Sequence, residues 1–165
     1  MNAIVGGWEW TGITTAESGL SFSPGISSGS LNTFDMGLRP DKVGNPNSGS
    51  CPGGAAVRTI NCWFNPTAYA APAAFTFGNA SRNSLRGPGI FTADWGLNKN
   101  IQLTERFKLQ VRWEVFNALN VANWSNPGGD VTNCNASGAC TSLPGQITDV
   151  SLPMRNQQIG LRLTF

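Results

Sequence analysis

The last segment of the chain, Arg155 to Phe165 (RNQQIGLRLTF), alternates between apolar and polar side chains. One side carries Ile159, Leu161, Leu163 and Phe165, and the other carries Gln158, Gly160, Arg162 and Thr164. A period of two residues is the pattern of a β-strand, in which successive side chains point to opposite faces of a sheet. This strand therefore has one apolar face and ends on an aromatic side chain.

Three earlier segments show the same alternation, at about residues 4–18, 90–103 and 107–119. In the second of these the alternation is nearly unbroken, and Lys99 is the exception on the apolar side. Each segment reaches the roughly 9 to 11 residues that a membrane-spanning strand needs, whereas ordinary soluble strands more often stop at about 5 or 6. The pattern predicts four long strands.

The connections between these segments differ greatly in length. Only Thr104, Glu105 and Arg106 separate the second segment from the third, which predicts a hairpin. The other two connections are long and rich in Gly, Pro, Ser and Asn. Short turns on one side of the membrane and long loops on the other are typical of outer-membrane barrels, so we expect an all-β fold of antiparallel transmembrane strands with two long extracellular loops. A soluble sandwich with an aromatic core remains the alternative.

Composition narrows the classes of function. Charged residues make up only 12% of the chain and its net charge is +2, so a nucleic-acid partner is not expected. No apolar run is long enough for a membrane helix. The first residues, MNAIVGGWEW, do not form a secretory signal, so we expect an incomplete chain in which Met1 is not a true start.

Four cysteines occur as two close pairs within polar, Gly-rich stretches. Local disulfides in exposed loops are the simplest explanation, and the possible disulfide residues are Cys51, Cys62, Cys134 and Cys140. Zinc is the competing explanation, but the tight cysteine spacing of a structural zinc site is absent and the chain has no histidine. We therefore expect no metal site.

The residues also argue against catalysis. Without histidine, a Ser-His-Asp or Cys-His arrangement cannot form within this chain. No feature places a carboxyl pair in a desolvated pocket, so we expect no enzyme activity, no catalytic residue and no cofactor. Arg112, Glu114 and Arg162 would face the lumen of a barrel, where they could meet a solute or simply pair across strands.

Several stretches, taken in order, resemble one known family. The chain is similar to the C-terminal part of TonB-dependent outer-membrane receptors, in particular the Oar-like receptors of Acidobacteria. The matching stretches are GGWEWTGITTAESGLSFSP (Gly6 to Pro24), CWFNPTAYAAP (Cys62 to Pro72), FGNASRNSLRGPGIFTADWGLNKNIQL (Phe77 to Leu103), RFKLQVRWEVFNALNVANWSNP (Arg106 to Pro127) and QIGLRLTF (Gln158 to Phe165).

The resemblance implies a barrel of about 22 strands. Residues 1–165 would supply its last four strands, at about 4–18, 90–103, 107–119 and 155–165, without the plug and TonB box. The implied partners are outer-membrane lipid, the rest of the barrel and plug, and TonB through the missing N-terminal part. The barrel-assembly machinery would read the C-terminal strand, with Leu161, Leu163 and Phe165 as the signal.

The function implied by the resemblance is uptake of an unidentified extracellular solute across the outer membrane of a Gram-negative bacterium. Two other functions stay open. One is an exported soluble β-sandwich that binds a partner through disulfide-pinned loops. The other is a porin-like channel that lacks a plug and needs no energy.

Overall fold

The computed structural model describes residues 5–26, 38–131 and 144–165. Its contacts divide the chain into two units. The first unit comprises residues 1–18, 89–123 and 152–165, and the second comprises residues 19–88 and 124–151. The first unit is formed by the segments with alternating side chains, and the second by the two long connections.

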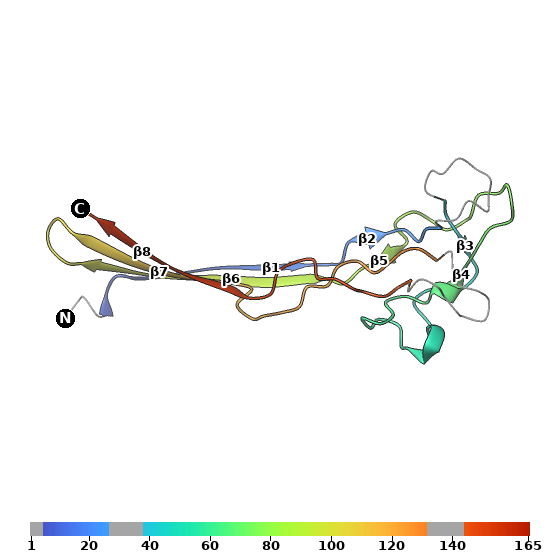
Figure 1. The fold of residues 1–165 in the computed structure, drawn as a ribbon, viewed down its shortest axis with the longest axis horizontal. Coiled ribbons are helices and arrows are strands. Elements are labelled where there is room, and N and C mark those ends of the chain that lie inside the picture. Colours follow the sequence, from blue (N-terminus) through green and yellow to red (C-terminus); the bar gives the residue numbers. More distant parts are fainter. Residues whose placement is uncertain (1–4, 27–37, 132–143) are drawn as a thin grey trace. The chain divides into compact units, whose positions relative to one another are not determined.

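The first unit is built on a four-stranded sheet with strand order β1-β6-β7-β8 (Figure 1). The strands are β1 (Trp8–Glu17), β6 (Ile90–Gln102), β7 (Lys108–Phe116) and β8 (Asn156–Thr164). Each neighbouring pair is antiparallel. The expectation of an all-β fold with antiparallel strands is therefore confirmed.

The strands lie within the expected segments, and β1 and β7 are shortened the most. The first begins at Trp8 after Gly7, which has φ 78°, and the third ends at Phe116 before Asn117, which has φ 50°. A positive φ is incompatible with the extended backbone of a strand. The backbone conformation at these two residues therefore determines where the strands begin and end. Hydrophobic alternation alone does not reveal these boundaries.

A tight turn joins β6 to β7. The backbone N–H groups of Leu103 and Thr104 both donate to the carbonyl of Phe107, at 3.0 and 3.2 Å. The Thr104 hydroxyl accepts a hydrogen bond from the Phe107 N–H at 3.1 Å. These bonds close the hairpin that the three polar residues predicted.

The second unit contains short elements that the sequence did not predict. Strand β2 (Ser21–Phe22) pairs with β5 (Leu85–Arg86), and β3 (Asp41–Lys42) pairs with β4 (Tyr69–Ala70). Two 3₁₀ turns accompany them, η2 (Pro52–Gly54) and η3 (Pro66–Ala68). The connections expected as long loops therefore have secondary structure of their own.

A small apolar core holds the second unit together. Phe64 packs against Phe22 with ring centroids 5.9 Å apart, and against Tyr69 with centroids 6.2 Å apart. The remaining buried members are Ala68, Ala80, Leu85 and Val131. Burial raises the pKa of the Tyr69 hydroxyl above its ordinary value of 10.0.

A disulfide joins Cys51 to Cys62 within this unit, and both residues are buried. The bond closes a short chain loop, which restricts the unfolded chain more than the folded one. Cys134 and Cys140 lie outside the described residues.

Candidate functional site

The register of the sheet gathers the apolar side chains on one face. Leu109 pairs with Leu163, Val111 with Leu161, and Trp113 with Ile159. On the other side of β7, Trp113 also pairs with Leu97, which pairs with Trp10 on β1. The apolar rows of all four strands are therefore aligned across the sheet.

This apolar face is largely uncovered among the described residues. Leu161 is 72% exposed and Trp10 is 69% exposed. Soluble monomers rarely expose a large continuous apolar surface, and a β-sandwich would cover it with a second sheet. The exposure favours a face that contacts lipid over the soluble sandwich.

Tryptophan rings cover a gap in this face at Gly12. Gly12 pairs with Trp95, and a Cβ atom at Gly12 would lie 3.4 Å from the Trp95 ring and 3.6 Å from the Trp10 ring. Both rings therefore lie over the position that a side chain at Gly12 would occupy. An aromatic side chain over a strand glycine restores the apolar surface that the missing side chain would leave open.

Lys99 is the one charged side chain in the apolar rows of these strands. It is only 7% exposed, and its ammonium group lies 4.7 Å from the centroid of the Trp8 ring. The same group donates a hydrogen bond to the carbonyl of Gly6. Long basic side chains near the end of a membrane-spanning segment direct their charge toward the interface, and Lys99 has this geometry close to the β6–β7 turn.

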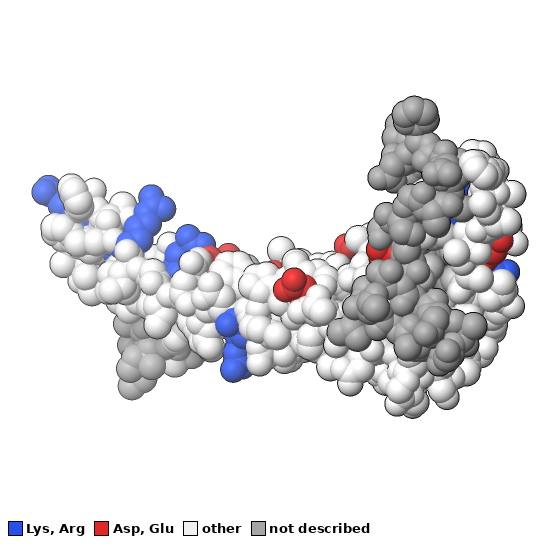
Figure 2. All heavy atoms as spheres, turned by 45° about the vertical axis from the view of Figure 1, so that its right-hand side comes forward, with Lys and Arg blue, Asp and Glu red and all other residues white. Residues whose placement is uncertain are grey.

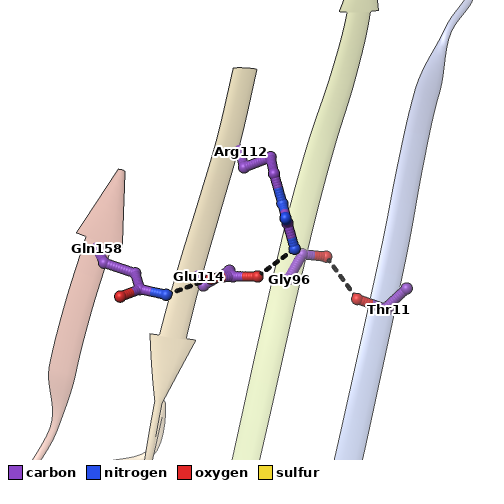
Figure 3. A network of polar contacts seen from close by, with 5 residues as sticks. All are labelled: Thr11, Gly96, Arg112, Glu114 and Gln158. Carbon is purple, nitrogen blue, oxygen red and sulfur yellow. Dashed lines mark hydrogen bonds and ion pairs between the residues drawn. The ribbon is translucent and has the colours of Figure 1, made fainter. Parts of the chain in front are cut away.

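The opposite face of the sheet carries a polar network (Figure 3). Arg112 donates to the Glu114 carboxylate at 2.7 Å, and Gln158 donates to the second oxygen of the same carboxylate. The Thr11 hydroxyl donates to the Gly96 carbonyl at 3.4 Å. Arg112 and Glu114 were expected on a lumen face, and the structure places them on one polar face with Arg162.

Charge is unevenly distributed along this polar face. The rows near the β6–β7 turn carry Lys108 and Arg162, whereas the carboxylates of Asp94 and Glu17 lie toward the other end of the sheet. Figure 2 shows several basic side chains towards the turn end, on the left, and one basic group at the lower edge midway, with the acidic ones from the middle onwards. The two ends of this face therefore offer different electrostatic environments.

Three asparagines after β7 fix the ends of the strands, a role that the alternation of side chains does not predict. Asn117 and Asn123 are 4% and 1% exposed. The Asn123 side chain accepts from the Phe91 N–H at 2.7 Å, and the Asn120 side chain accepts from the Arg155 N–H at 3.1 Å. This asparagine segment, residues 117–123, thereby contacts the beginnings of β6 and β8.

The predicted assembly residues lie at the free edge of the sheet. Leu161 and Leu163 are on the apolar face of β8, and Phe165 follows the strand and is 90% exposed. Within the described part of the chain, β1 and β8 each pair with one neighbour only. Their outer edges leave backbone groups available for pairing with further strands, as a closed barrel requires.

Neither a metal cluster nor a membrane helix is found in the part of the chain that the structure describes. Within residues 5–26, 38–131 and 144–165, no three His, Cys, Asp or Glu residues lie together as metal ligands. No helix in the same ranges is long and apolar enough to cross a membrane.

A sheet of long strands with an apolar exposed face, a polar face and open edges defines a wall segment of a membrane-spanning β-barrel. Residues 1–158 match the family described as outer membrane beta barrel domain, and the chain belongs to this family. The protein is therefore localised in the outer membrane. No curated protein and no solved structure matches the chain.

Proposed function

We propose that this chain is part of a TonB-dependent receptor of the Oar-like type that takes up an extracellular solute. The observation that carries the proposal is the sheet itself, whose apolar rows stay aligned across all four strands while the opposite rows stay polar. Membership of the outer-membrane barrel family supports the membrane location. The receptor type rests on the resemblance of five ordered sequence stretches.

In this proposal the four strands supply the last part of a large barrel. The free edge of β8 pairs with a strand from elsewhere in the protein, and β1 continues into preceding strands. The connections between β1 and β6 and between β7 and β8 lie outside the cell. The apolar face contacts lipid and the polar face lines the lumen.

The proposed partners follow from this arrangement. Outer-membrane lipid contacts the apolar face, and the plug contacts parts of the lumen. TonB engages the N-terminal part of the receptor and supplies energy from the inner membrane. The barrel-assembly machinery recognises the strand that ends with Leu161, Leu163 and Phe165. The proposed role is not enzymatic, since the chain has no histidine and no feature that argues for a catalytic carboxyl pair.

A passive, porin-like channel is the second candidate, because the same two-faced strands would serve it equally well. The two candidates differ in their dependence on TonB. An antibody against the C-terminal peptide, used after formaldehyde cross-linking of the source cells, separates them. A receptor gives an outer-membrane band much larger than 17.5 kDa that shifts further when cross-linked to TonB.

The results that would contradict a TonB-dependent receptor can also be told apart. A purified protein that never cross-links to TonB and lets sucrose pass freely through liposomes would be a passive channel. A soluble species of 17.5 kDa would contradict both candidates.

A further inference from the structure

The turn end of the polar face contains a hollow of about 530 Å³. Its polar lining comes from three strands and consists of Asn100, Gln102, Lys108, Gln110, Arg162 and Thr164. The register places these residues in two adjacent rows, because Asn100 pairs with Gln110 and Gln102 with Lys108. The volume lies in the range of small-molecule sites, roughly 300 to 1,000 Å³.

Lys108 and Arg162, the two cationic residues of this hollow, differ from Arg112, which forms an ion pair with Glu114. Among the described residues, neither Lys108 nor Arg162 forms an ion pair. No Asp or Glu side chain of the described ranges lines the hollow. Glu114 is bound by Arg112 and Gln158, Glu9 pairs in register with Asn98 one row beyond the hollow, and Glu105 lies in the turn. The described residues that line the hollow therefore carry two positive charges and no negative one.

The neighbouring amides complement these cations. The Gln110 amide donates to the Asn100 side-chain oxygen at 3.0 Å, which occupies that acceptor and leaves the Asn100 NH₂ group as a donor. Thr164 adds a hydroxyl that can also donate. Charged and neutral donors around one open volume are the chemistry that holds phosphate and carboxylate groups.

We propose that Lys108 and Arg162 form a binding site for the phosphate or carboxylate group of a small anionic solute. The inference rests on the proposed function, because it requires the polar face to line a wet lumen. It deepens that function by naming the chemical class of a solute that this end of the lumen favours. Lysine and arginine side chains perform the same task where pores select anions.

Chemical modification of the full-length protein in detergent tests the site. Phenylglyoxal modifies accessible arginines, and mass spectrometry measures the rate at Arg162 against Arg82, which lies in the second unit. Inorganic phosphate or citrate added to anion-free buffer should slow modification of Arg162 and leave Arg82 unchanged. If neither anion changes the rate at Arg162, the site does not exist.

Binding measurements with variants complete the test. The Lys108→Gln and Arg162→Gln variants should each bind inorganic phosphate about tenfold more weakly by ³¹P line broadening, because each loses a charge-assisted hydrogen bond. Arg162→Lys should retain part of the affinity, and Arg82→Gln should match the wild type. Equal binding by all variants would overturn the proposal, provided that each still shows heat-modifiable migration as a folded barrel.

One further outcome would contradict the inference. An acidic segment of the same protein could occupy the hollow, in which case Arg162 would resist phenylglyoxal before any anion is added and phosphate would have no effect. The assay measures binding without transport. Its failure would leave TonB-dependent uptake intact, and a negative TonB cross-link would leave anion binding intact.

Discussion

The side chain of Asn117 forms two hydrogen bonds with the backbone of Val121, one as donor and one as acceptor. Its amide donates to the Val121 carbonyl at 2.9 Å, and its side-chain oxygen accepts from the Val121 N–H at 3.0 Å. The backbone N–H of Asn117 also donates to the Asp94 carboxylate at 2.8 Å. A single buried side chain thus shapes the turn after β7, while its own N–H anchors that turn to β6.

Replacing Asn117 should destabilise the barrel. Asn117→Gly keeps the positive φ but removes the side-chain bonds, and we expect a loss of about 1 to 3 kcal/mol. Asn117→Ala should cost about 1 kcal/mol more, because Ala is disfavoured in the left-handed region. Denaturant unfolding of the full-length protein measures both values.

Asn156→Ala is the matched control for these variants, since Asn156 is an exposed asparagine on β8. It should change the unfolding free energy by less than about 0.5 kcal/mol. Equal stability of the Asn117 and Asn156 variants would show that the asparagine segment does not hold the strand ends.

Lys99 and Trp8 should be energetically coupled. Lys99→Met keeps the apolar stem and removes the charge over the Trp8 ring, and Trp8→Leu removes the ring. A double-mutant cycle on unfolding free energy should give a coupling of about 0.5 to 2 kcal/mol. Trp8→Leu combined with Lys42→Met is the control pair, for which the changes in unfolding free energy should add. Additive changes for Trp8→Leu and Lys99→Met would exclude the interaction.

Tyr69 should make the second unit sensitive to alkaline pH. Burial raises the pKa of its hydroxyl in the folded state, so the unfolded state ionises first as the pH rises through about 10. Stability contributed by neutral Tyr69 is complete below that pH and falls above it. Tyr69 is the only tyrosine of this chain, so Tyr69→Phe gives the matched control.

Two measurements check this prediction. Subtracting the tyrosinate absorbance of Tyr69→Phe from that of the wild type isolates the ionisation of Tyr69. The midpoint of this difference should lie above the ordinary pKa of a tyrosine hydroxyl. Proteolysis of the second unit should accelerate above about pH 10 in the wild type and less in the variant. Titration at or below the ordinary value would be inconsistent with a buried hydroxyl.

Arginine placed on the apolar face should impair insertion. Leu161→Arg or Val111→Arg should cost about 2 to 4 kcal/mol if these side chains face the middle of the bilayer. Gln110→Arg, next to Val111 on the opposite face, should have little effect. Folding yield into lipid vesicles measures the difference, and similar yields for all three variants would remove the lipid-facing assignment.

The sheet was more predictable from the sequence than the connections. Side-chain alternation in β6 and β8 reflects the two environments of a barrel wall, so a period of two residues reveals both the strands and their faces. The ends of the strands depend on single backbone angles, as at Gly7 and Asn117, which hydrophobic patterns do not report. Positive φ is enriched at asparagine, and this was the available signal for the asparagine segment.

The second unit was harder to predict for a different reason. Its core depends on contacts between residues far apart in the sequence, such as Phe22 with Phe64, and its paired strands span only two residues each. Such short elements have no periodicity. The hollow at Lys108 and Arg162 likewise depends on the register between strands. The sequence alone does not show which residues pair across neighbouring strands.

Accessibility along β8 tests the two-faced wall most directly. Spin labels placed one at a time from Gln158 to Leu163, in the full-length protein in lipid, can be probed with oxygen and with a water-soluble nickel complex. We predict high oxygen exposure at Ile159, Leu161 and Leu163 and high nickel exposure at Gln158, Gly160 and Arg162. Uniform accessibility, or alternation in the opposite phase, would contradict this prediction.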